Sequence, residues 1–157
     1  MNINISNELI DFFNCVDNKK VLATVGKEGI PHVVVKDNMF IENNTVVYLE
    51  LLEGSKTNKN MIYSLWFNKD VAINVFDIAG TSYQIKGIPV KTIVAGSVFE
   101  KHYNYITELD SRNDLAAIYY IEIKEVHGGS ATAAVCTGPH RRYRGLCARS
   151  ARRLRQW

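Results

Sequence analysis

Cysteine is scarce in this 157-residue chain, and its three copies (Cys15, Cys136 and Cys147) form no CxxC pair and have no histidine at zinc-finger spacing. An odd number of isolated cysteines favours neither a disulfide framework nor a structural metal site, so we expect reduced thiols and no metal. The roughly 18 uninterrupted apolar residues of a membrane helix are also missing. The first eleven residues are rich in Asn and acidic, unlike a signal peptide. We therefore expect a cytoplasmic protein without a membrane partner.

Acidic residues and lysine are absent from residues 127–157, which carry seven arginines. Residues 1–126 carry all sixteen acids against twelve basic residues, a net charge of −4, although the whole chain is at +3. This abrupt change predicts one domain over 1–126 and a foreign tail over 127–157, from a vector or a shifted reading frame. The alternative is a disordered basic arm that binds nucleic acid or an acidic surface. The negative body argues against a nucleic-acid-binding barrel.

Short apolar runs separated by turn residues fill the body of the chain. They predict about seven strands, the first four of which (21–25, 30–36, 39–41 and 46–51) form a meander because their loops are short. Later strands are expected at 71–76, 82–85, 87–96 and 116–126, with a bend near Gly87 and Pro89. Helices are expected from Ser6 to near Asp17 and over 61–67 and 99–109, with Trp66 and Phe67 packed on a helix face. This pattern is typical of a mainly β fold, an antiparallel β-barrel with peripheral helices.

A loop rich in Gly, Ser, Thr and Lys (53–60) lies between a predicted strand and a predicted helix. Backbone N–H groups, hydroxyls and ammonium groups converge in such a loop, and together they can bind a phosphate. The alternative is a solvated turn in which Ser55 or Thr57 caps the helix. Nucleoside triphosphate hydrolysis is not expected, because Lys56 does not follow a glycine as the lysine of a P-loop does.

Five segments in a characteristic order carry a family resemblance: 21–25, 29–35, 46–48 with the loop after it, 68–73 and 83–87. Over about residues 8–125 the chain resembles the pyridoxamine 5′-phosphate oxidase-like FMN-binding split-barrel family. The resemblance implies a six-stranded antiparallel split β-barrel. It also implies a homodimer that holds FMN at the subunit interface, with the phosphate bound by basic and hydroxyl side chains.

Carried over by position, the resemblance implies a set of cofactor-binding residues. The strand around Val33–Val35 would run along the flavin ring with its backbone, and Ser55, Lys56 and Thr57 would match the phosphate loop, with Lys59 as a substitute basic residue. The whole set is His32, Val33, Val34, Val35, Lys36, Tyr48, Leu49, Ser55, Lys56, Thr57, Lys59 and Gln84. No catalytic acid or base is identified by the pattern.

The resemblance implies an oxidoreductase that passes electrons through FMN to or from a small molecule, with a nicotinamide as a candidate electron donor. The alternative is a module that binds or senses flavin or haem without turnover. Nothing after residue 126 matches the segment that carries substrate contacts in the true oxidase, which argues against pyridoxamine phosphate as the substrate.

Overall fold

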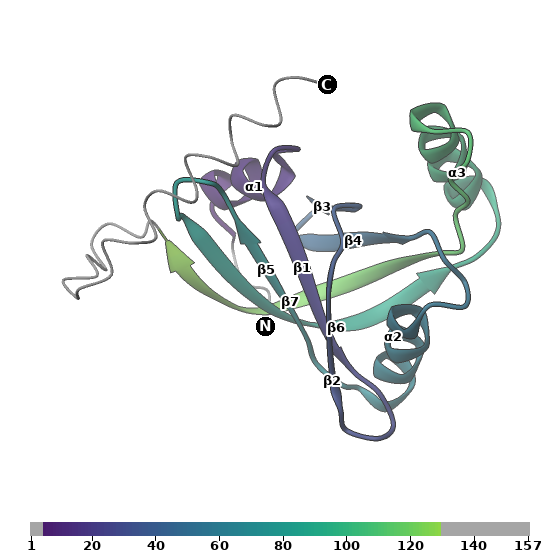
Figure 1. The fold of residues 1–157 in the computed structure, drawn as a ribbon, viewed down its shortest axis with the longest axis horizontal. Coiled ribbons are helices and arrows are strands. Elements are labelled where there is room, and N and C mark those ends of the chain that lie inside the picture. Colours follow the sequence, from purple (N-terminus) through teal and green to yellow (C-terminus); the bar gives the residue numbers. More distant parts are fainter. Residues whose placement is uncertain (1–4, 130–157) are drawn as a thin grey trace, which may run out of the picture.

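The computed structural model describes residues 5–129, which form seven strands and three helices. Figure 1 shows their arrangement. The elements are α1 (Asn7–Asn14), β1 (Lys19–Val25), β2 (Pro31–Val35), β3 (Met39–Glu42), β4 (Thr45–Glu50), α2 (Lys56–Phe67), β5 (Val71–Phe76), β6 (Ser82–Ile93), α3 (Ser97–Leu109) and β7 (Ala117–Gly129). None of these three helices is long and apolar enough to cross a membrane.

All seven strands belong to one antiparallel sheet in the order β2-β1-β5-β6-β7-β4-β3. The mainly β antiparallel fold is therefore confirmed. Of the eight runs predicted as strands, 82–85 and 87–96 are one strand, which leaves the seven observed. The six strands implied by the family resemblance are wrong, because all seven strands find a hydrogen-bonded neighbour. The predicted meander is also wrong: β1 pairs with β2 and β3 with β4, but β2 and β3 form opposite edges of the sheet.

The short link between the two edge strands forces the sheet to curl. A flat sheet of seven strands would separate its edges by roughly 29 Å, because neighbouring strands lie about 4.8 Å apart. The chain from Val35 to Met39 reaches at most roughly 14 Å. The edges therefore approach each other at this link without pairing, and the sheet forms the curled half-barrel seen in Figure 1.

The inner face of the curled sheet holds the main core. α1 and α2 both contribute to it, with Phe13 and Met61 fully buried against strand residues such as Ile73 and Tyr119. A smaller cluster around Val47, Leu49 and Ile106 lies on the other face of β4, where α3 packs. Residues 46–50 of β4 are thus all buried, because both faces of this strand are covered.

Helix α2 leaves two aromatic side chains, Trp66 and Phe67, on its exposed side. It turns polar side chains inward, so that Asn60 donates to Thr24 Oγ1 (3.0 Å) in a buried contact. Trp66 is 75% exposed and Phe67 is exposed as well, so neither side chain packs into the core, and the predicted helix-face packing of Trp66 is wrong. Phe67 packs instead on Tyr63 of the same helix, with ring centroids 4.7 Å apart.

The bend predicted near Gly87 is confirmed as a pair of register shifts between β6 and β7, at Lys86/Gly87 and Pro89/Lys91. The predicted strands 82–85 and 87–96 are one strand, which continues through this irregularity. β7 extends to Gly129, three residues past the composition change at 126. The rest of the predicted tail lies outside the described residues, and its foreign origin stays a prediction.

Candidate functional site

The edge strand β2 presents two different surfaces. His32, Val34 and Lys36 alternate along its half-buried face, whereas the side chains of Val33 and Val35 are 61% and 57% exposed on the other. Lys36 N–H donates to Lys20 O (2.9 Å), which makes the even-numbered residues the hydrogen-bonded partners of β1. Because such pairs alternate in antiparallel strands, the N–H and C=O groups of Val33 and Val35 point toward the free edge.

The half-buried face of β2 meets the start of α2. His32 Nε2 lies 3.2 Å from Thr57 Oγ1, in a contact between residues 25 positions apart. Helix α2 begins at Lys56, with Ser55 Oγ accepting from Asn58 N–H (2.9 Å). The predicted loop 53–60 is thus half helix, and the predicted start of the helix at 61 is wrong by one and a half turns. Ser55 as the cap is confirmed.

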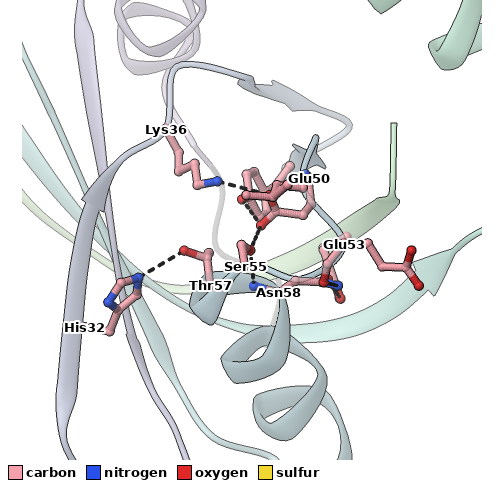
Figure 2. A network of polar contacts seen from close by, with 10 residues as sticks. His32, Lys36, Glu50, Glu53, Ser55, Thr57 and Asn58 are labelled. Carbon is pink, nitrogen blue, oxygen red and sulfur yellow. Dashed lines mark hydrogen bonds and ion pairs between the residues drawn. The ribbon is translucent and has the colours of Figure 1, made fainter. Parts of the chain in front are cut away.

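A buried carboxylate, Glu50 at the end of β4, lies between β2 and the start of α2 (Figure 2). Its Oε1 accepts from Lys36 Nζ (3.0 Å) and from Leu52 N–H (3.1 Å). Its Oε2 accepts from Tyr48 Oη (2.6 Å) and from Ser55 Oγ (3.1 Å). Burial, reinforced by the bond to Glu50, raises the pKa of Tyr48 above its ordinary range, so the phenol stays a donor.

The start of α2 is also tied to β7. Asn58 is buried, its Nδ2 donates to Glu53 O (2.8 Å), and its Oδ1 accepts from Tyr119 Oη (2.5 Å). Burial, with a smaller contribution from the Glu50 carboxylate, raises the pKa of Tyr119 to about 12. These bonds set the position of the first turn of α2 relative to the sheet.

The structure brings together most of the predicted cofactor-binding residues but not all of them. Lys36, Tyr48 and Ser55 meet at Glu50, and His32 meets Thr57. Leu49 points to the other face of β4, under α3, and lies apart from this group. Gln84 is exposed on β6, which β1 and β5 separate from β2 by roughly 14 Å across the sheet.

Sequence reasoning gave no site role to Asn58 and Tyr119, and the family resemblance placed Glu50 only beside the flavin strand, with Tyr48 and Leu49. One signal was present for Glu50, because alternation from Tyr48 puts this charged residue on a buried face of an apolar strand. Asn58 and Tyr119 are 61 positions apart, and no local pattern connects them.

The exposed side of the site carries a solvent-exposed ion pair. Lys56 Nζ lies 3.3 Å from Glu28 Oε2, and both side chains are more than half exposed. The hydrogen bond from Lys56 lowers the pKa of Glu28. Lys59, three positions further along α2, is also exposed. Across residues 5–129, no group of three or more His, Cys, Asp and Glu side chains is arranged to hold a metal ion.

Comparison with known proteins identifies relatives of the fold. No protein-family model and no curated sequence matches the chain. The structure matches a candidate pyridoxamine 5′-phosphate oxidase from Lactobacillus delbrueckii at 20% identity and a TM-score of 0.56, over 78% of this chain and 93% of that one. It matches an FMN-binding protein from Syntrophomonas wolfei at 13% identity and a TM-score of 0.62, over 79% of this chain and 85% of that one. It also matches HutZ, a haem storage protein from Vibrio cholerae, at 13% identity and a TM-score of 0.58, over 81% of this chain and 96% of that one.

These matches confirm the resemblance to the pyridoxamine 5′-phosphate oxidase-like split barrels at the level of the fold. With identities of 20% or less, they establish the fold alone. The function has to be argued from the side chains of this chain.

Proposed function

We propose that this protein binds FMN, with the phosphate at the start of α2 and the flavin ring along the free edge of β2. The observation that carries the proposal is the contact between His32 and Thr57, which joins the helix start to that edge. The fold likeness to an FMN-binding protein supports it.

The start of α2 fits a phosphate group. The N–H groups of Lys56 and Thr57 lie in the first turn, where a helix has no internal acceptors and where its dipole favours an anion. The exposed ammonium groups of Lys56 and Lys59 add donors at the same end, where the Thr57 hydroxyl is buried in its contact with His32. Lys56 can exchange its exposed partner Glu28 for the phosphate at little cost, because solvent-exposed ion pairs are weak.

The free edge of β2 fits the polar side of a flavin ring. The outward N–H and C=O groups of Val33 and Val35 can donate to and accept from ring carbonyl and nitrogen atoms. An N–H donor there would stabilise the negative charge that a flavin gains on reduction. When bound, FMN would supply hydride and single-electron transfer. The residues of β2 would orient the ring and leave its exposed face open to a small molecule.

We further propose that the functional unit is a homodimer with the cofactor at the subunit interface. The free edge and the exposed valines of β2 offer one side of such an interface, and α2, which contacts β2, exposes Trp66 and Phe67. Exposed apolar side chains of this kind are typical of surfaces that a partner covers. Light scattering after gel filtration would find twice the monomer mass, and a monomer would contradict the proposal.

The reaction we propose is oxidoreduction of a small molecule, with a reduced nicotinamide as the electron donor. The second candidate is a module that binds flavin or haem without turnover, which the fold likeness to a haem storage protein supports. Absorbance of the purified protein separates flavin from haem. Anaerobic bleaching of bound flavin by a reduced nicotinamide then separates an enzyme from a binding module.

The phosphate assignment is tested by comparing FMN with riboflavin, which lacks the phosphate. Replacing Lys56 and Lys59 together by Ala should weaken FMN binding by about tenfold or more and leave riboflavin binding unchanged. The matched control replaces Lys91 and Lys101, which are exposed elsewhere in the fold. Unchanged FMN affinity in the Lys56/Lys59 variant would show that the phosphate binds elsewhere or not at all.

A further inference from the structure

Glu50 sits among donors that suit an anion from outside the chain. Its carboxylate is 0% exposed and accepts from an ammonium group, two hydroxyls and a backbone N–H, two donors on each oxygen. The same kinds of donor bind phosphate groups in proteins. These donors form an arrangement suited to an anion, which we call the anion pocket, and the Glu50 carboxylate occupies it (Figure 2).

Three residues of this pocket, Lys36, Tyr48 and Ser55, belong to the predicted cofactor-binding set, and Ser55 belongs to its phosphate loop. Lys36 is on the half-buried face of β2, and its ammonium group is mostly buried against Glu50 and Tyr48. Ser55 is the residue that caps α2, directly beside the first turn where the phosphate is proposed to bind. Both are already bonded to Glu50.

We infer that Glu50 is a specificity-determining residue, whose carboxylate withholds Lys36 and Ser55 from an incoming phosphate. This inference rests on the proposed function for its ligand, since the phosphate in question is that of FMN. Glu50 cancels the charge of Lys36 and places a negative charge beside the start of α2. The wild-type site would then draw its preference for FMN over riboflavin from Lys56, Thr57 and the helix start alone.

The test is the Glu50→Gln variant, because glutamine keeps the shape and can still accept from Lys36 and Leu52 while it removes the negative charge. Affinities for FMN and riboflavin are measured by titration for wild type, Glu50→Gln and the double variant Glu50→Gln/Lys36→Met. The matched control is Glu53→Gln, which removes an exposed carboxylate from the same loop, one that points away from the Lys36 contact in Figure 2.

The inference predicts that Glu50→Gln binds FMN about tenfold tighter or more, because one repulsive charge is removed and the positive charge of Lys36 is no longer cancelled. Riboflavin affinity should stay within about twofold, since it has no phosphate to use the released donors. The gain should disappear in the double variant and should be absent from Glu53→Gln. A folded Glu50→Gln protein with unchanged or weaker FMN binding overturns the inference and matches a purely structural role for Glu50.

If neither wild type nor Glu50→Gln binds any flavin, the proposed function fails, and inorganic phosphate then decides about Glu50. A phosphate-dependent rise in melting temperature for Glu50→Gln, absent from wild type and from the double variant, supports the anion pocket. No such rise in any variant overturns it.

Lysine acetylation of the wild type gives a readout that requires no variant to fold. Held by Glu50, Lys36 should be acetylated more slowly than the exposed Lys59, and added FMN should protect Lys56 without changing the rate at Lys36. Acetylation of Lys36 as fast as that of Lys59, or protection of Lys36 by FMN, contradicts the inference.

Discussion

The bond between Tyr119 and Asn58 connects the core of the sheet to the start of α2, and removing it tests how firmly that start is held. Tyr119→Phe deletes the hydroxyl and leaves Asn58 Oδ1 buried without its donor, 2.5 Å from where the oxygen was. An unsatisfied buried polar atom costs about 1–3 kcal/mol. The ring remains and keeps its packing against Tyr48, with centroids 6.1 Å apart. We therefore expect a loss of about 1–3 kcal/mol at neutral pH.

The same substitution should change the dependence of stability on alkaline pH. The folded protein holds the Tyr119 proton with a pKa of about 12, and the unfolded chain releases it at the ordinary value of 10.0. The stability that this difference supplies is fully present below pH 10 and is lost as the pH rises toward 12. Two pKa units correspond to at most about 2.7 kcal/mol. Tyr119→Phe lacks this proton, so its stability should fall less steeply between pH 10 and 12.

Urea unfolding followed by circular dichroism at several pH values measures both effects. The control is Tyr120→Phe, because the next residue of β7 keeps its ring under Lys91 Nζ (5.5 Å) in either form and its hydroxyl bonds to no other described side chain. Equal stabilities of Tyr119→Phe and Tyr120→Phe at pH 7, or parallel profiles above pH 10, would refute the role assigned to the Tyr119 hydroxyl.

Two further substitutions test the parts of the fold that position the site. Ser55→Ala removes the cap of α2, where Ser55 Oγ accepts from Asn58 N–H (2.9 Å). The free energy of unfolding, measured by thermal melts, should fall by about 1–2 kcal/mol. An unchanged melting temperature would contradict this. Gly87→Ala should cost about 1–3 kcal/mol, because a Cβ there would lie 2.6 Å from Glu122 O across the bulge, whereas Gly54→Ala meets nothing within 4 Å and should be close to neutral.

Features with local causes were predictable from the sequence. Ser6 and Ser55 cap helices because their hydroxyls reach N–H groups only three positions away. The bend in β6 follows from a glycine and a proline placed close together in one strand. These signals act over a few residues, so a single sequence contains them in full.

The relation of β2 to β3 was not predictable in this way. A link of three residues ordinarily joins paired neighbours, and the alternation of apolar residues is the same whether the two strands pair or not. The outcome depends on the whole sheet, in which β1 pairs with β5 and β4 with β7, leaving β2 and β3 as edges. The free edge on which the proposed flavin site depends is therefore a property of the complete topology.

Glu50 combines a feature that the local sequence predicts with one that depends on the whole fold. Alternation along β4 places its side chain on the same buried face as Tyr48, and a buried charge requires partners. The sequence thus identifies Glu50 as a charged residue on an otherwise apolar, buried strand face. It does not identify Lys36, 14 positions before it, as the ion-pair partner. Because local rules in folded proteins fail mostly at functional or strained sites, a charged residue on a buried strand face is a sound starting point for a search for function. Here that search leads to the residue that we infer controls access to the phosphate site.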